Sequence, residues 1–206
     1  MIITVLGANG KTGVEVVRQV LEAGHSVHAV VRRAESLPPQ AGLEVFVGDV
    51  TDPAVIAKAS QGTDAIVSAL GSLKMPLMTP AVRAVIEAAE STGVKRFVLM
   101  SAYVVLRDRL RPGLKLASHL GMKMAIEDKT ASEALLRSSD LTWTIVHVST
   151  LTDRPGTGQV REVPPTERLG MRHRISRADS ARWMLKSVCL DEYYGAEVVL
   201  AQGRAS

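Results

Sequence analysis

The stretch from Ile2 to Gly24 constrains the fold most, because a short apolar run, a glycine-rich loop and a helical pattern follow one another without a gap. Residues 2–6, IITVL, are apolar and mostly β-branched, which is typical of a buried parallel strand. The loop GANGKTG comes next, and apolar residues at helical spacing continue to Ala23-Gly24, where the helix is expected to end. Strand, glycine loop and helix in this order predict the entry to a dinucleotide-binding βαβ unit.

Each of the three loop glycines has a physical reason in this interpretation. Gly7 permits the tight turn out of the strand, and Gly10 lets a pyrophosphate approach the backbone with no Cβ in the way. Gly13 lets the helix pack closely on the sheet, and the free N–H groups of the first helical turn favour phosphate oxygens. The alternative is an ordinary turn between a strand and a helix, because glycines mark turns in many folds.

The loop GANGKTG resembles the G-A-T-G-x-T-G loop of the atypical short-chain dehydrogenases, in their NmrA-like and flavin/biliverdin reductase branch. Segments 152–158, 174–179 and 191–195 are similar to the D-x-P-x-T-G, I-S-R-x-D and D-E-Y-x-G segments of those reductases. The resemblance covers nearly the whole chain and implies one NAD(P)-binding domain over residues 1–206. Strands that alternate with helices predict the same class, an α/β Rossmann-type doubly wound, mostly parallel sheet with helices on both faces.

Apolar runs and helical periodicity define the other expected elements. Strands are expected at 26–31, 43–47, 65–71 with its turn, 95–100, 140–146 and 197–200, and helices after 52, at 79–93, at 128–138 and before 189. Residues 104–124 mix arginines, Pro112-Gly113 and scattered apolar residues, and the resemblance implies a loop over the nicotinamide there. Segments 101–125 and 147–175 are expected to face the substrate.

Composition limits the possible partners. With 206 residues, 46% of them hydrophobic and 22% charged, the chain has enough apolar material for one globular core. Only 3% of the residues are aromatic, so few rings are available to stack on bases, and we expect no nucleic-acid partner. The net charge of +4 is dispersed, with its densest clusters at 107–115 and 168–177. These clusters either form a solvated surface or guide an anionic ligand.

The chain carries neither a basic–apolar leader with a cleavage site nor an apolar run long enough to cross a bilayer. We therefore expect a cytoplasmic protein that binds no membrane and is a monomer or a weak homodimer. Cys189 is the single cysteine, so no disulfide forms within the chain, and its apolar helical surroundings predict a buried thiol.

The end of the second strand decides between NAD and NADP in this kind of fold. An acidic residue there bonds the ribose 2′-hydroxyl of NAD, whereas an arginine accommodates the 2′-phosphate of NADP. Arg32 holds that place, Arg33 follows, and Glu35 comes too late in the sequence to be the obvious ribose ligand. Two arginines that merely solvate a loop are the alternative. The pattern favours NADP(H).

Two further segments have a cofactor interpretation and a structural one. The resemblance implies that Asp49 and Val50 face the adenine, while Thr51 or Asp52 before Pro53 is a standard helix start, and both can hold at once. The turn after the fourth strand lies where open α/β sheets bind ligands, so Ala69–Gly71 are expected to pass behind the ribose and phosphates. His28 alternates with apolar residues and is interpreted as a hydrogen-bonded strand histidine.

Three residues are candidates for the chemistry. Ser101 follows the fifth strand, where the resemblance implies a hydrogen bond to the nicotinamide or the substrate, and a serine that caps a turn is the alternative. Lys129 is at the position where many family members place a lysine or histidine near the nicotinamide ribose, although a solvated helix lysine needs no such role. His147 is either an acid–base group or a side chain turned into the sheet.

The chain departs from the family at two points. It has no Tyr-x-x-x-Lys, since none of its three tyrosines precedes a lysine by four residues, and it has His147-Val148 where the family usually has Arg-Pro. We expect no metal ligand. The expected catalytic residues are Ser101, Lys129 and His147. The expected cofactor contacts are Gly7, Asn9, Gly10, Lys11, Thr12, Gly13, Arg32, Arg33, Asp49, Val50, Ala69, Leu70, Gly71, Ser101, Val148, Ser149 and Thr150.

These features predict an NADPH-dependent reductase that transfers a hydride to a small conjugated acceptor, namely a flavin, a quinone or a biliverdin-like compound. The alternative is a redox sensor of the NmrA-like kind, which binds NADP(H) without turning it over and which both departures would suit. A nucleotide-sugar epimerase or dehydratase is the least favoured, because it would need the tyrosine and a larger C-terminal domain.

Overall fold

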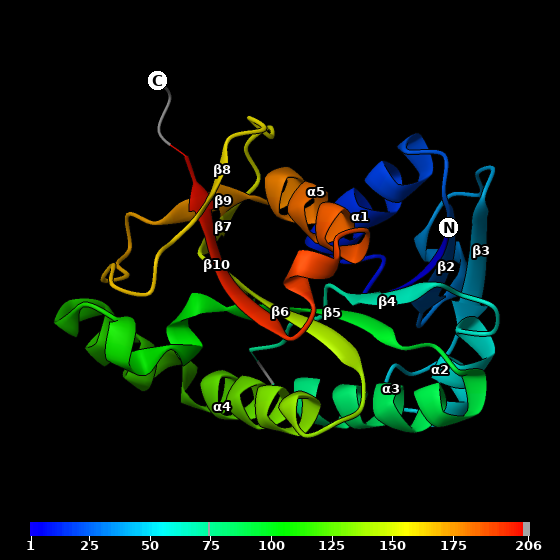
Figure 1. Ribbon diagram of the computed structural model, residues 1–206, viewed down its shortest axis with the longest axis horizontal. Helices are drawn as coiled ribbons and strands as arrows, with labels where there is room; N and C mark the ends of the chain where they lie inside the picture. Colours follow the sequence, from blue (N-terminus) through cyan, green and yellow to red (C-terminus); the bar gives the residue numbers. More distant parts are fainter. Residues whose placement is uncertain (74, 204–206) are drawn as a thin grey trace.

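A computed structural model describes residues 1–73 and 75–203; Lys74 and residues 204–206, which the predicted domain includes, lie outside them. One eight-stranded sheet organises this part of the chain, in the order β3-β2-β1-β4-β5-β6-β10-β8 (Figure 1). Its strands are β1 (Ile2–Leu6), β2 (Ser26–Val31), β3 (Leu43–Val47), β4 (Ala65–Ser68), β5 (Arg96–Ala102), β6 (Thr142–Val148), β8 (Val160–Glu162) and β10 (Ala196–Gln202). All neighbours are parallel except β8, which is antiparallel to β10.

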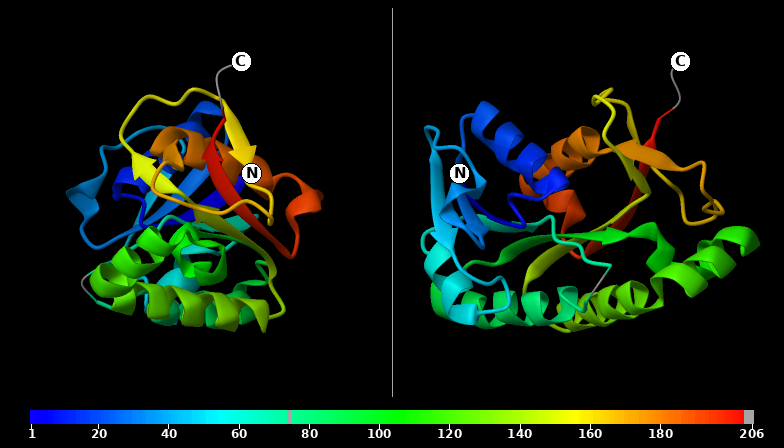
Figure 2. Two further views of the ribbon diagram at one scale, coloured as in Figure 1. Left: turned by 90° about the vertical axis from the view of Figure 1, so that its left-hand side faces the viewer. Right: turned by 180° about the vertical axis from the view of Figure 1, so that it is seen from behind.

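Helices cover both faces of the sheet, as Figures 1 and 2 show. On one face lie α1 (Lys11–Glu22) and α5 (Arg177–Val188), and on the other α2 (Pro53–Ala59), α3 (Met78–Thr92) and α4 (Pro112–Arg137). The two layers between helices and sheet are almost entirely aliphatic, as the low aromatic content requires. The Rossmann-type, mostly parallel sheet that the sequence predicts is therefore confirmed.

The segment 104–124, expected to be a loop, is largely helical. Two short 3-10 helices, η2 (Tyr103–Val105) and η3 (Arg107–Arg109), lead into α4, which begins at Pro112 and changes direction at Met122. Pro112 does not interrupt this helix, because proline is well tolerated at the first helical position, where its missing N–H has no partner anyway. The amino-terminal half of α4 extends past the end of the sheet in Figures 1 and 2.

The remaining elements are short. Strands β7 (Thr150–Thr152) and β9 (Arg174–Ser176) form a separate parallel pair, and 3-10 helices η1 (Ala34–Ser36) and η4 (Asp191–Tyr193) occupy loops. Cys189 was predicted to be buried, and this is wrong: it follows the last residue of α5 and is exposed. Among the described residues, no helix is both long and apolar enough to span a bilayer.

Candidate active site

Every predicted cofactor residue lies at the carboxyl edge of the sheet. The glycine loop follows β1, Arg32 and Arg33 follow β2, and Asp49 and Val50 follow β3. Further along the same edge, residues 69–71 follow β4, Ser101 is the last but one residue of β5, and residues 148–150 lie where β6 ends. Because parallel strands end together, one edge collects segments that are up to 143 positions apart in the sequence (Gly7 to Thr150). Ligands bind at this edge in open α/β sheets.

The glycine loop has the backbone geometry that its sequence predicts. Gly7 has φ +75°, a left-handed conformation that residues with a Cβ rarely adopt. A Cβ on Gly13 would lie 1.9 Å from the carbonyl oxygen of Gly7, so only glycine permits this approach of α1 to the loop. On Gly10 a Cβ would meet only that same oxygen, at 3.1 Å, and otherwise open space. The loop is therefore open on the side where a phosphate would approach.

The start of α1 is suited to an anion. No side chain caps this helix at Gly10, so the N–H groups of its first turn remain available at the positive end of the helix dipole. The ammonium of Lys11 projects from this turn, and its Nζ lies 2.9 Å from Asp153 Oδ2. Asp153 also binds Arg177 Nη1 at 2.5 Å, and all three side chains are at least partly exposed. One carboxylate thus bridges the loop after β1 and the start of α5.

The ends of β2 and β3 form a basic corner. Arg32 is exposed and makes no hydrogen bond or ion pair with the described residues, whereas Arg33 faces Glu35 with an N···O distance of 3.8 Å. Hydrogen bonds from Thr51, together with the nearby charge of Arg32, hold the pKa of Asp49 below its usual value. Asp52 caps α2 by accepting from the N–H of Ala54 at 2.9 Å, which confirms the predicted helix start.

The ends of β4 and β6 complete the edge. The backbones of Ala69 and Gly7 lie close together, because a Cβ added to Gly7 would be only 3.3 Å from the carbonyl group of Ala69. Beyond β6, the hydroxyl of Ser149 is buried and has no partner in the described part of the chain, and Thr150 shares a hydrogen bond of 3.3 Å with Tyr103. A buried hydroxyl without a partner is costly unless a ligand supplies one. These strand ends therefore fit a polar cofactor.

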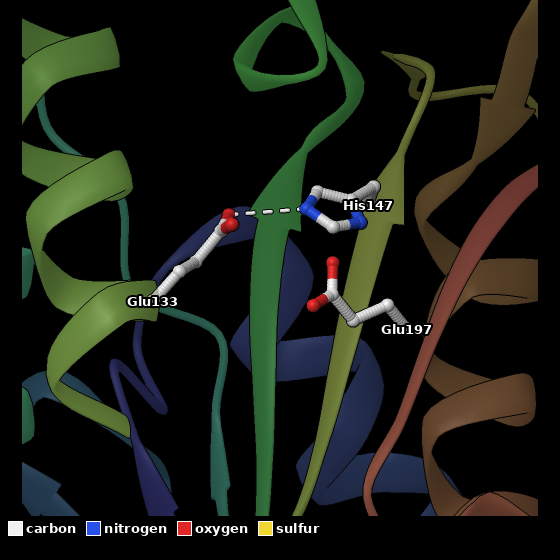
Figure 3. A group of neighbouring side chains, drawn as sticks. All are labelled: Glu133, His147 and Glu197. Carbon is white, nitrogen blue, oxygen red and sulfur yellow. Dashed lines mark hydrogen bonds and ion pairs between the residues drawn. The ribbon is translucent and has the colours of Figure 1, made fainter. Parts of the chain in front are cut away.

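Ser101 and His147, both predicted site residues, meet at a glutamate that sequence reasoning missed. Ser101 Oγ donates to Glu133 Oε1 at 2.5 Å. His147 Nε2 lies 3.1 Å from the same oxygen, and Figure 3 shows this second contact as a dashed line. All three side chains are almost fully buried between β5, β6 and α4. Of the two interpretations left open for His147, the structure therefore supports a side chain turned inward. Its Nδ1 is buried without a partner among the described residues.

Glu133 is ionised in this arrangement. Burial by itself disfavours its charge, but His147, Ser101 and Arg137 more than compensate, and the pKa of Glu133 falls below its usual value. Arg137 binds Glu133 Oε2 at 2.9 Å and also Glu197 Oε1 at 2.6 Å. Glu133, His147 and Glu197 lie close enough together to suggest a metal site, but Arg137 already bridges the two carboxylates and supplies the positive charge.

Lys129 lies one helical turn before Glu133 on α4, so the two side chains share a face of the helix. It makes no side-chain hydrogen bond or ion pair within residues 1–73 and 75–203. Burial lowers the pKa of Lys129, although the charges of Glu133 and Asp128 oppose this shift. The Lys129 ammonium is therefore partly buried and not fully solvated.

A cavity of about 800 Å³ continues the edge beyond β6. Its lining includes Arg111, Arg172 and Arg174, which are exposed and have no acidic partner among the described residues. Arg174 pairs in register with Thr150, and Thr150 contacts Tyr103, two residues after Ser101. One lining residue of the cavity, Arg174, is therefore paired with Thr150, a predicted cofactor contact.

Glu167, the acidic residue among those that line this cavity, already binds Arg161 and His173. Both oxygens of Glu167 accept from Arg161, each at 2.8 Å, and His173 Nε2 lies 2.8 Å from Oε1. These contacts, that with Arg161 foremost, lower the pKa of Glu167 to about 2. Since Glu167 compensates Arg161, the other three arginines leave the cavity with a positive field. The sequence predicts that segments 101–125 and 147–175 face the substrate, but it does not show that these three arginines line one cavity.

Comparison with known proteins now decides the family. A family model described as NAD(P)H-binding matches residues 7–190. This chain belongs to that NAD(P)H-binding family. The family binds NAD(P)H, and the resemblance to atypical short-chain dehydrogenases is confirmed.

Relatives extend along nearly the full chain. A Bacillus subtilis (strain 168) protein, named as the uncharacterized sugar epimerase YhfK, is 33% identical over 204 residues, 93% of this chain and 89% of its own. The solved structure of ChuY, an anaerobilin reductase of Escherichia coli O157:H7, is 26% identical, with a TM-score of 0.84 over 100% of this chain and 99% of that one. A short-chain dehydrogenase/reductase of Veillonella parvula in complex with NADP shares only the fold, at 14% identity and a TM-score of 0.85 over 98% and 94%.

Proposed function

We propose that this member of the NAD(P)H-binding family is an NADPH-dependent reductase of a conjugated acceptor that carries acidic groups, of the flavin or biliverdin-like kind. The observation that carries the proposal is the cavity beside the cofactor edge, with three arginines that no acidic residue of the described chain engages. Guanidinium groups bind carboxylates and phosphates through paired N–H donors. A quinone, which has no acidic group, uses this cavity less well.

The choice of NADPH over NADH rests on Arg32. This side chain stands at the end of β2 with no hydrogen bond or ion pair to the described residues, and the first acidic residue after it, Glu35, is near Arg33. An arginine here suits a 2′-phosphate, which an NADH-specific site would exclude with an acidic residue.

The proposed reaction requires little acid–base catalysis by residues of the chain. The nicotinamide supplies the hydride when bound, and the protein holds donor and acceptor in contact, which by itself removes much of the barrier. The chain has no Tyr-x-x-x-Lys. Tyr193 binds Glu162 in β8, and the hydroxyl of Tyr103 shares a hydrogen bond with Thr150. Lys129 can stabilise negative charge that develops on the acceptor, and solvent can deliver the proton to an extended conjugated system.

Two of the proteins compared above bear on the choice. ChuY is named as an anaerobilin reductase, and its resemblance covers 100% of this chain and 99% of ChuY. YhfK is named as a sugar epimerase, but this chain lacks the Tyr-x-x-x-Lys that such chemistry would need. The redox sensor remains the alternative, since it needs only the cofactor site.

The test is NADPH oxidation followed at the cofactor's own absorbance, with FMN, a quinone and biliverdin offered in parallel and NADH as the control. We expect turnover of an acidic acceptor with NADPH preferred. Exchanging Arg172 and Arg174 together for glutamine should raise KM for that acceptor about tenfold and leave the affinity for NADPH unchanged. Tight NADPH binding without turnover of any acceptor would instead identify a sensor, and no NADPH binding would contradict both functions.

A further inference from the structure

The contact between Ser101 and Glu133 has a consequence for the direction of hydrogen bonding. An ionised carboxylate accepts hydrogen bonds and cannot donate one. All the bonds that Glu133 makes are of this kind: Oε1 faces Ser101 and His147, and Oε2 faces Arg137. The single hydroxyl hydrogen of Ser101 is therefore used inside the protein.

A serine hydroxyl has one hydrogen and two lone pairs. With the hydrogen directed at Glu133, only the lone pairs of Ser101 remain for a ligand. Ser101 cannot then polarise a substrate carbonyl, because that role requires a donor. It can receive an N–H or O–H from the nicotinamide half of the cofactor, whose carboxamide and ribose both carry such groups.

We infer that Glu133 is a positioning residue of this site, which fixes Ser101 as a hydrogen-bond acceptor toward the nicotinamide half of the bound cofactor. The inference rests on the proposed cofactor site. It assigns a function to a buried carboxylate whose hydrogen bonds in the described chain go to Ser101, His147 and Arg137. His147 and Arg137 hold this carboxylate from two further sides, and Figure 3 shows the contact with His147. These contacts fix its orientation toward Ser101.

The variant Glu133→Gln reverses the direction of the bond. A guanidinium has no acceptor, so the new amide turns its oxygen to Arg137 and its NH₂ to Ser101. Ser101 must then accept from this NH₂ and direct its own hydrogen at the ligand, where a donor meets a donor. Removing the hydroxyl in Ser101→Ala loses the contact but creates no such conflict.

The experiment compares the affinities of the wild type, S101A, E133Q and the double variant for NADPH and for 2′,5′-ADP, which carries only the adenosine half. For NADPH we expect a loss of about fivefold in S101A and about thirtyfold in E133Q, and the double variant should bind like S101A. For 2′,5′-ADP all four proteins should bind alike. The control E197Q removes a charge from the same network at a residue that does not touch Ser101, and it should bind NADPH like the wild type.

A purely structural role for Glu133 predicts other outcomes. In that case E133Q lowers the affinities for NADPH and for 2′,5′-ADP alike. Alternatively, E133Q lowers the affinity for NADPH by the same factor in the wild-type and in the S101A background. Either result overturns the inference. If E133Q does not fold, S101A decides: unchanged NADPH affinity overturns the inference, and a loss confined to NADPH supports it. The experiment measures binding and not turnover, so it tests the inference even if the protein binds NADPH without oxidising it. A wild-type protein that binds neither NADPH nor 2′,5′-ADP would contradict both the inference and the proposed function.

Discussion

Gly13 shows how one residue can be fixed by local geometry alone. Its α-carbon sits so near Gly7 that a methyl group would overlap the carbonyl oxygen there, at 1.9 Å. Such requirements can be predicted from sequence, because they depend on a turn of seven residues. The partner of His147 could not be predicted in this way. Glu133 is 14 positions away on a different element, and the contact depends on how α4 lies across β5 and β6.

Gly13→Ala should destabilise the fold by about 3 kcal/mol or more, because the loop backbone must shift to admit the new Cβ. The matched control is Gly121→Ala in α4, where a Cβ meets nothing within 4 Å and alanine favours the helix. Urea unfolding of both variants gives the comparison. Equal stability of the two proteins would contradict the close packing of α1 on the loop.

Arg32→Ala should weaken NADPH binding by about 10- to 100-fold through the loss of charge-assisted bonds to the 2′-phosphate. NADH affinity should change by less than about threefold, since its ribose carries no phosphate. Titration of cofactor fluorescence measures both. Arg83→Ala is the control, because that arginine is exposed on α3 and is not among the expected cofactor contacts. Equal weakening of the two cofactors by Arg32→Ala would reject the assignment to the 2′-phosphate.

At the scale of elements, α4 supports its neighbour α3 through one carboxylate. Asp128 accepts the N–H groups of Leu77 and Met78 on one oxygen, at 2.7 Å each, and that of Thr79 on the other, at 2.9 Å. A residue 50 positions downstream thus caps α3, which has no capping side chain of its own at Leu77. Sequence rules search for caps next to the helix they close, so this one could not be anticipated. Burial opposes its charge, but these N–H groups lower the pKa of Asp128 overall.

Asp128→Asn should cost about 2 kcal/mol of unfolding free energy near neutral pH, since an amide NH₂ would face backbone donors. A lowered folded-state pKa means that the wild-type advantage is complete above the ordinary aspartate value of about 4 and is lost as the pH falls through the folded value. Urea unfolding at several pH values should therefore show the two proteins converging below about pH 4. The exposed Asp140→Asn is the control, and a pH-independent difference for Asp128 would exclude the ionised cap.

The length of α4 illustrates a second limit of sequence reasoning. Its carboxyl-terminal part was predicted at 128–138, but the turns before it, interrupted by glycines and charges, were expected to be a loop. Their helix is stabilised from outside: Leu114 and Met122 pack on a small third cluster that includes Leu110 and Leu169. Tertiary packing of this kind overrides weak local propensity.

At the scale of the molecule, strand alternation predicts the class of fold and the sheet edge at which the candidate cofactor residues lie. The cavity beside that edge could not be predicted, because its three unpaired arginines are far apart in the sequence. Arg111 directly precedes α4, Arg172 lies in a later loop, and Arg174 is the first residue of β9. Only the folded structure shows that Glu167 binds Arg161 and leaves the other three arginines of the cavity without an acidic partner among the described residues.

The bridge through Asp153 connects the first and last thirds of the chain beside the glycine loop, where the proposed phosphate site lies. Asp153→Asn should raise NADPH affinity about twofold to fivefold at moderate salt, because a negative charge near an anionic ligand is removed and Lys11 is released. The unfolding midpoint should not move, since exposed pairs contribute little. Fluorescence titration and thermal unfolding measure the two effects. Thr152→Ser is the control, and lower affinity in Asp153→Asn would show that the bridge assembles the site.

The exposed thiol of Cys189 lies 3.7 Å from the sulfur of Met1, which precedes β1, whereas the glycine loop follows that strand. The helix that ends at this cysteine begins beside Asp153 and has 12 residues, so it extends for roughly 18 Å. The chain's single cysteine is thus a natural anchoring point remote from its binding edge. If the protein were attached to a sensor chip through this sulfur, every molecule would present the carboxyl edge of its sheet to the solution.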